Sequence, residues 1–278
     1  MTGVAQATRQ LYARVRESHD LFIRLVDAAP RTPRSLPAGT VVAIAPAALY
    51  KQYRRSGADG RRIREVADKF GLATETMPLK PIGSLDENAS MILRWLHGCQ
   101  YDNIVLVSLS KGSSDVKKAL AIDCEAFRKV SVWISVGGLL DGTPLARWVL
   151  SNERLPAAFR ALHRIRGVDL RFFEDVDRRT GGPLDFELVL PPHLRLIHIV
   201  GYPLLEHASN WLSRVLYRKL SEDGPNDGFM LLEDVSRWPG AVYPVWGADH
   251  YFRMAGDPKA LLERVLCVAV ELEPHSNC

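Results

Sequence analysis

The chain has few cysteines and no pattern that would pair them. Cys99, Cys124, Cys267 and Cys278 are widely spaced along 278 residues, and no two of them form a Cys-x-x-Cys pair. A disulfide framework or a structural zinc site is therefore not expected. We predict reduced thiols, no bound metal and a cytoplasmic location.

Long apolar runs are also missing. No stretch approaches the roughly 20 apolar residues that a membrane-spanning helix needs. The N-terminus carries Arg9, Arg14 and Arg16 among polar residues and has no apolar signal core, so secretion is not indicated. The net charge of +4 is small, and no basic stripe interleaved with aromatics appears. We therefore predict no integral membrane span and no nucleic-acid partner.

What the chain does contain is an alternation of apolar runs and helical patterns. The predicted strands cover residues 40–46, 72–79, 103–107, 130–136, 194–200 and 241–246. Between and after them, helical spacing predicts helices over 63–70, 87–96, 113–120, 211–220 and 261–270. Strands that alternate with helices of about 10–15 residues predict an α/β fold with a mostly parallel sheet and helices on both faces. Pro244 in the last run favours an edge strand there.

The chain divides into an N-terminal segment, 1–35, and a main domain, 36–278. Residues 4–28 have mostly helical apolar spacing, so we predict one helix packed on the main domain, with a dimerisation or membrane-surface helix as alternatives. A proline-containing linker follows it. Within the main domain, about 141–192 break the alternation and are interpreted as a cap or lid above the carboxyl ends of the strands. Its aromatics either line the cleft or form a small satellite core; they are Trp148, Phe159, Phe172 and Phe173.

The most informative stretch is the strand-to-helix junction at Ser108-Leu-Ser110-Lys-Gly112. A buried strand that turns sharply into a helix around a central serine is typical of a nucleophile elbow, usually written G-x-S-x-G. Here Ser108 replaces the first glycine. The alternative is an ordinary loop in which Ser108, Ser110 and Ser113 serve as turn and cap residues.

Two later loops supply an acid and a histidine. Asp227 follows the strand at 194–200, and His250 follows the last strand. A serine hydroxyl needs an imidazole to take its proton, and the imidazole needs a carboxylate to orient it. Asp223 and Asp249 remain alternatives for the acid.

The competing histidines are less well placed. His207, which follows a sheet strand, is the strongest rival to His250, although a helix N-terminal role explains it as well. His198 lies inside a predicted strand and is expected to be a core residue with its hydrogen bonds satisfied.

At this point the chain resembles the α/β-hydrolase fold, and lipase-like members in particular. The segment Gly137–Ala146, with Gly142-Thr-Pro-Leu-Ala146, is similar to the segment that follows the next strand in many lipases. Asn226-Asp-Gly228 resembles the acid loop, and Gly247-Ala-Asp-His250 resembles the histidine loop. The resemblance spans about residues 40 to 270.

The resemblance implies a set of roles. Ser110 would be the nucleophile, Asp227 the orienting acid and His250 the general base, with no cofactor. Oxyanion donors would be the backbone N–H groups of Lys111 and of Ala48, although the family's usual glycine is Ala47 in this chain.

The expected function is a serine hydrolase acting on a carboxylic ester, either a small molecule or a lipid, through an acyl-enzyme. An acyltransferase with the same triad and a catalytically inactive binding protein are the alternatives. The Lys111 side chain is expected to be a surface charge, or else to attract acidic substrates. The sequence does not indicate an oligomeric state.

Overall fold

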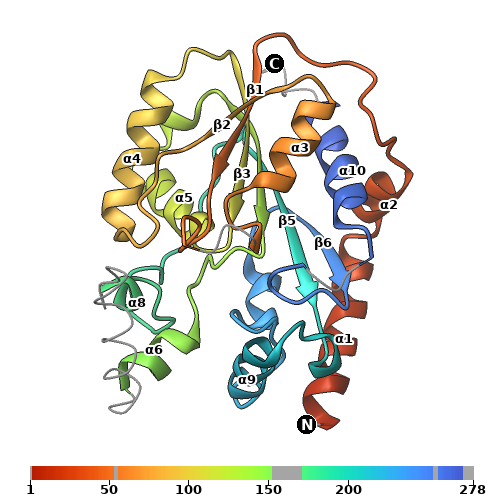
Figure 1. Cartoon of the computed structure of the whole chain (residues 1–278), viewed down its shortest axis with the longest axis vertical. Helices are drawn as coiled ribbons and strands as arrows, with labels where there is room; N and C mark the ends of the chain where they lie inside the picture. Colours follow the sequence, from red (N-terminus) through yellow and green to blue (C-terminus); the bar gives the residue numbers. More distant parts are fainter. Residues whose placement is uncertain (1, 53–55, 152–170, 253–255, 272–278) are drawn as a thin grey trace.

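A computed structural model describes residues 2–52, 56–151, 171–252 and 256–271, and its centre is one six-stranded sheet. The strands are β1 (Thr40–Ala45), β2 (Ala73–Thr76), β3 (Asn103–Leu109), β4 (Val130–Val136), β5 (Arg195–Tyr202) and β6 (Ala241–Trp246). Their order is β2-β1-β3-β4-β5-β6, and every neighbouring pair is parallel (Figure 1). The predicted parallel sheet is confirmed, and β6 with its Pro244 is an edge strand as expected.

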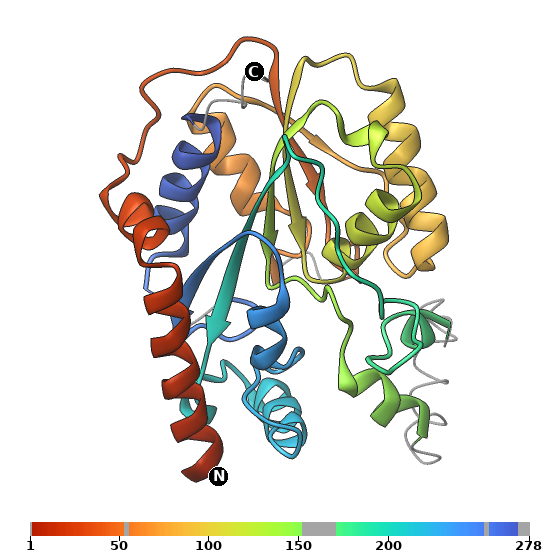
Figure 2. The same cartoon turned by 180° about the vertical axis from the view of Figure 1, so that it is seen from behind.

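Helices cover both faces of the sheet. The helices α2 (Asp20–Ala28), α3 (Arg61–Lys69) and α10 (Pro258–Glu271) lie on one face, and α4 (Leu85–Gly98) and α5 (Lys111–Ile122) lie on the other (Figures 1 and 2). Successive residues of β1 alternate between two apolar cores: Val42 and Ile44 pack on the first side, Val41 and Ala43 on the second. This double burial explains why the strands are continuous apolar runs in the sequence.

The N-terminal segment is two helices, so the prediction of a single helix over 4–28 is wrong. The helix α1 (Thr2–Ser18) ends before His19, whose φ of −116° and ψ of 21° are not helical, and α2 follows. Leu11 and Val15 of α1 pack with residues at the ends of β5 and β6, whereas Val26 of α2 packs under α3 and α10. The break lets the two helices reach different cores. Packing on the main body is confirmed, and the domain division near residue 35 stays a prediction.

The insertion leaves the sheet where predicted. Its described parts include α6 (Pro144–Ser151) and α8 (Arg171–Asp175), which lie beyond the carboxyl ends of the strands (Figure 1). Phe159 lies outside the described residues. The buried Lys117 ammonium of α5 donates to the carbonyl oxygens of Leu140, just before the insertion, and of Leu184 within it, at 3.0 and 2.9 Å, and so connects the insertion to the body. The role of the insertion as a cap stays a prediction.

The remaining elements connect sheet and insertion. A longer helix, α9 (Trp211–Leu220), follows β5, and the short 3-10 helices are η2 (Glu125–Phe127), η3 (Leu205–His207) and η4 (Leu232–Arg237). Cys99, Cys124 and Cys267 are unpaired, and Cys278 lies outside the described residues. Within the described ranges, none of the helices is both long enough and apolar enough to cross a membrane. A cytoplasmic location stays a prediction.

His198 of β5 is a core residue, as expected, but only one of its ring nitrogens is satisfied. Nε2 lies 2.9 Å from the Pro239 carbonyl oxygen, and Nδ1 has no hydrogen-bond partner among the described residues. Burial lowers the pKa of His198 to about 4, although the Pro239 carbonyl opposes this shift. Since an unfolded histidine has a pKa of about 6.5, the unfolded chain binds the extra proton more readily below that pH.

We therefore expect His198 to make folding sensitive to acid. The contribution of neutral His198 to the free energy of unfolding is fully present above pH ~6.5 and is lost as the pH falls towards 4. About 2 kcal/mol of it is lost by pH ~5. Urea unfolding of wild type and His198→Gln at pH ~6.5 and pH ~5 measures this effect. The variant should lose less free energy of unfolding on acidification than the wild type. His97→Gln, at an exposed histidine whose Nε2 lies 3.2 Å from an Asp123 carboxylate oxygen, is the control and should not reduce the loss of free energy of unfolding on acidification. Equal acid sensitivity in wild type and His198→Gln would contradict the prediction.

Candidate active site

Ser110 occupies a strained turn between β3 and α5. Its φ of 50° and ψ of −119° lie outside the regions that serine ordinarily adopts. Three backbone hydrogen bonds hold it there. Its N–H donates to the Val136 carbonyl at 3.0 Å, and its carbonyl accepts from the N–H groups of Leu139 at 3.2 Å and Ser113 at 3.0 Å. The sharp strand-turn-helix geometry expected from the sequence is present, and it lies at the carboxyl end of a central strand.

Gly112 sets the distance between this turn and the loop after β1. A Cβ at Gly112 would lie 2.5 Å from the Ala45 carbonyl oxygen and 2.7 Å from that of Pro46. Real Cβ atoms do not approach backbone so closely, so only glycine allows this contact. The first turn of α5 is therefore packed directly against the start of the loop that contains Ala48.

The rival serines belong to a buried hydroxyl cluster. The Ser108 and Ser113 Oγ atoms lie 2.7 Å apart, the Trp133 indole N–H donates to Ser108 at 2.7 Å, and Ser135 donates to Ser113 at 2.9 Å. Ser108 and Ser113 are fully buried, whereas Ser110 is half-buried. The cluster gives Ser108 a structural role in place of the glycine usual at this position.

His250 lies between Ser110 and Asp227. Its Nε2 is 2.9 Å from the Ser110 Oγ, and its Nδ1 is 2.8 Å from the Asp227 Oδ2. The three side chains come from the loops after β3, β5 and β6, which end at the same edge of the sheet. The structure thus brings together the three residues that the sequence singled out.

The Asp227 carboxylate is held in place on its other side. Its Oδ1 accepts from the backbone N–H groups of Phe229 and Met230, both at 2.8 Å, and its own carbonyl accepts from the His250 N–H at 3.0 Å. The Phe229 ring stacks on the His250 ring with centroids 4.5 Å apart. These contacts fix the imidazole plane and direct one carboxylate oxygen to it.

Asp223 and Asp249, the alternatives for the acid, lie in different environments from Asp227. Asp223 is exposed. Asp249 is buried, and its Oδ2 accepts from the Ser209 hydroxyl at 2.6 Å and the Ser209 N–H at 3.2 Å, while Oδ1 accepts from the Tyr251 N–H. The rival histidine, His207, accepts from the Leu204 N–H through Nδ1, which is a turn-capping role.

The backbone N–H groups of Lys111 and Ala48 lie at the carboxyl edge of the sheet and have no hydrogen-bond acceptor among the described residues. Lys111 is the first residue of α5, where helical N–H groups have no intrahelical partner. In the loop after β1, the N–H groups of Ala47 and Leu49 donate to carbonyl oxygens, whereas no hydrogen bond from the Ala48 or the Lys111 N–H to another described residue is found. Ala47 does not have a positive φ, so the absence of the family's glycine causes no backbone strain there.

The Lys111 side chain is not a surface charge, and that expectation is wrong. The side chain is only 2% exposed, and its ammonium lies 2.5 Å from the Asp115 carboxylate, which also accepts from the Asn88 amide at 2.9 Å. Burial raises the pKa of Asp115, against the effect of Lys111. A buried, paired ammonium does not attract acidic substrates at the surface. The i, i+4 spacing of Lys111 and Asp115 was a signal for this pair.

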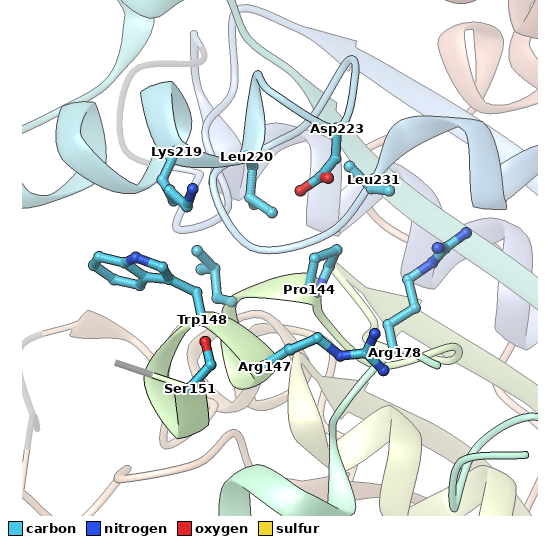
Figure 3. Close-up of a pocket in the computed structure, with 10 residues that line it drawn as sticks. Pro144, Arg147, Trp148, Ser151, Arg178, Lys219, Leu220, Asp223 and Leu231 are labelled. Atoms are coloured by element: carbon cyan, nitrogen blue, oxygen red, sulfur yellow. The ribbon is translucent and has the colours of Figure 1, made fainter. Parts of the chain in front are cut away.

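A pocket of about 450 Å³ lies between α6 and α9 (Figure 3). Residues of α6 face residues of α9 and the following loop across it. The lining residues are Pro144, Leu145, Arg147, Trp148, Ser151, Arg178, Lys219, Leu220, Asp223 and Leu231. Phe229 packs against the cluster of Leu145, Leu220 and Leu231 and also stacks on His250, so it connects the pocket lining with the imidazole.

The predicted lid aromatics divide between two places. Trp148 lines the pocket, whereas Phe172 lies 5.7 Å from the Lys111 ammonium and makes an edge contact with Phe173. The sequence expected the insertion to form the cleft, but it did not indicate that α9 supplies the opposite wall. Only packing of α6 on α9, through Leu145 and Leu220, creates that wall.

The site offers no set of side chains suited to a metal. Within the described ranges, no group of three or more His, Cys, Asp or Glu side chains could hold a metal ion. That the protein works without a metal or cofactor stays a prediction.

No protein-family model matches the chain, and no curated protein matches it. Solved structures do. A metagenomic carboxyl esterase aligns with a TM-score of 0.63 and 19% identity, over 95% of this chain and 90% of that one. A mature-form lipase from Bacillus licheniformis aligns with a TM-score of 0.56 and 19% identity, over 84% of this chain and 95% of that one. A Legionella pneumophila phospholipase, in complex with thio-NAD, has a TM-score of 0.51 and 12% identity, over 84% of this chain and 56% of that one.

These similarities concern the fold. The chain has the α/β-hydrolase fold, with a single parallel sheet and helices on both faces. At 19% identity or less, the reaction has to be argued from the side chains of this chain itself.

Proposed function

We propose that this protein is a serine hydrolase that cleaves a carboxylic ester through an acyl-enzyme. The observation that carries the proposal is the hydrogen-bonded chain from Ser110 Oγ through His250 to Asp227, with separations of 2.9 and 2.8 Å. Serine is a poor nucleophile at neutral pH, and such a chain is the arrangement that activates it. The strained backbone at Ser110 supports the same conclusion, because strain of this kind is concentrated at functional sites.

In the first half of the reaction, Ser110 Oγ attacks the ester carbonyl carbon while His250 Nε2 accepts the hydroxyl proton. The Asp227 carboxylate accepts from Nδ1–H and stabilises the imidazolium. The tetrahedral oxyanion accepts hydrogen bonds from the Lys111 and Ala48 N–H groups, and each such donor is worth about 3 kcal/mol in enzymes where it was removed. The C–O bond then breaks, and the alcohol leaves with the proton from His250.

In the second half, water attacks the acyl-enzyme, His250 takes the water's proton, and Ser110 regains it as the acid leaves. An acyltransferase would differ only in using an alcohol or amine in place of water, and no feature of the described residues favours that acceptor. An inactive binding protein is disfavoured by the intact hydrogen-bonded chain.

The pocket supports an ester, either a small molecule or a lipid, that has both an apolar and a polar part. Its apolar lining includes Leu145, Trp148, Leu220 and Leu231. Its charged lining consists of Arg147, Arg178, Lys219 and Asp223. A volume of about 450 Å³ suits a group of small-ligand size. The cap role of the insertion is part of this proposal.

Covalent labelling tests the proposed function. We expect a fluorophosphonate to label the protein once, on the peptide that contains Ser110, because only an activated serine displaces the fluoride of the probe and becomes phosphonylated. Labelling should disappear in His250→Ala, which leaves Ser110 in place but removes its base. Absence of labelling in the wild type would overturn the hydrolase proposal. If the wild type is labelled, analysis of the products formed with water and with alcohol acceptors separates a hydrolase from a transferase.

A further inference from the structure

The outer face of α9 is unusually apolar for a surface helix. Trp211 is 75% exposed, Leu212 45% and Val215 41%. At i, i+1 and i+4 spacing these side chains lie on one side of the helix, while Ser213, Tyr217 and Leu220 are buried on the other. Contiguous exposed apolar groups of this kind mark interaction surfaces.

The same face carries two exposed arginines. These are Arg214 and Arg218, and the helix Trp211–Leu220 contains no acidic residue. Lys219 is half-buried and is paired with Glu222, just beyond the helix. Neither arginine forms an ion pair with another residue in the part of the chain that the structure describes. At 100° per residue, the two arginines lie together on one flank of the apolar stripe.

The helix that carries this face is packed near the proposed catalytic residues. It lies beyond the carboxyl end of the sheet (Figure 1). Ser209, just before its N-terminus, donates twice to Asp249, the neighbour of His250, and Leu220 on its inner side lines the pocket between α6 and α9. Whatever binds the outer face of α9 is therefore held one helix away from the site.

We propose that the outer face of α9 binds the surface of an anionic lipid bilayer. An apolar stripe flanked by cations, with a tryptophan at its edge, matches the chemistry of helices that lie in the membrane interface. Trp211, Leu212 and Val215 enter the headgroup and acyl boundary, and Arg214 and Arg218 contact the lipid phosphates. Bilayer binding does not depend on the proposed ester hydrolysis; if both hold, the site is presented to esters carried by the membrane.

A second exposed apolar pair provides a matched control. Leu21 and Leu25 of α2 are 80% and 49% exposed, which is comparable to the α9 residues. Their charged neighbour Arg24 is paired with Asp20 at 2.5 Å, so this pair lacks a free cationic flank. Both figures place α2 away from α9 (Figures 1 and 2).

Vesicle flotation with the whole chain tests the proposal. All proteins carry Ser110→Ala, so that lipid turnover cannot change the vesicles. We expect flotation with vesicles of phosphatidylcholine and phosphatidylglycerol, little with phosphatidylcholine alone, and weaker binding at high salt. Arg214→Gln with Arg218→Gln should weaken binding roughly tenfold or more. Trp211→Ser with Val215→Ser should weaken it at least as much, whereas Leu21→Ser with Leu25→Ser should not.

Each outcome has a clear meaning once circular dichroism shows that the variants fold. Equal binding by wild type and both α9 variants would overturn the proposal. The proposal would also be overturned if the wild type does not float but forms concentration-dependent dimers that Trp211→Ser with Val215→Ser abolishes. That result would assign the face to contact with a second copy of the chain. Loss of flotation confined to the two α9 variants supports it. Failure of fluorophosphonate labelling would leave this result untouched.

Discussion

The variant Ser110→Ala is expected to lose essentially all turnover of a short p-nitrophenyl ester, with kcat reduced roughly 10⁶-fold, as when a nucleophilic serine is removed from a protease. Without Oγ no acyl-enzyme forms, and only oxyanion and binding contributions remain. The fold should be unaffected, because His250 is the only hydrogen-bond partner of this half-buried side chain among the described residues, and alanine adopts a positive φ no less readily than serine. Steady-state kinetics and circular dichroism provide the two measurements.

The buried serines supply the control for this prediction. Ser108→Ala should keep turnover within a few-fold but leave the Trp133 N–H without its acceptor, at a cost of about 1–3 kcal/mol of stability. Ser113→Ala should likewise lower stability more than activity. Wild-type turnover in Ser110→Ala, or collapse in Ser108→Ala at unchanged stability, would transfer the nucleophile to another serine.

The strands could be predicted from the sequence because most are buried on both faces. Residues 130–136 are predicted and observed with the same bounds, and the strand predicted from residue 103 extends to Leu109, two residues beyond its predicted end. The short edge strand β2 is only part of the predicted 72–79, because its residues 73–76 are exposed or half-buried and carry no continuous apolar signal. The proximity of the serine, the acid and the histidine could also be predicted, because each follows a strand and parallel strands bring their carboxyl ends to one edge of the sheet.

Other features depend on contacts between distant segments, and local sequence patterns do not encode such contacts. The break at His19 follows from two cores that α1 and α2 reach separately. The burial of Lys111 depends on Asn88 and Phe172, which come from α4 and from the insertion. The opposite wall of the pocket is supplied by α9.

The choice of the acid likewise depends on contacts between distant segments, and mutation can test it. We expect Asp227→Asn to lower kcat by about 10⁴-fold, as the equivalent change does in a serine protease. The carbonyl oxygen of the introduced amide can still accept from the Phe229 and Met230 N–H groups, so the loop keeps its shape. The NH₂ group then faces His250 Nδ1 and donates to it, which moves the ring proton to Nε2. An imidazole protonated at Nε2 cannot accept the Ser110 proton. KM should change little, because the carboxylate does not touch the substrate.

The neighbouring acids test whether this effect belongs to Asp227 alone. Asp223→Asn, at an exposed position, should stay within a few-fold of wild type. Asp249→Asn should lower stability more than kcat, because Asp249 accepts from the Ser209 hydroxyl and N–H at the start of α9. If Asp227→Asn keeps a near-normal kcat while Asp223→Asn collapses, the acid lies four residues upstream. If neither variant loses turnover, Ser110 and His250 act as a dyad, and the 2.8 Å contact between His250 and Asp227 serves only to hold the loop.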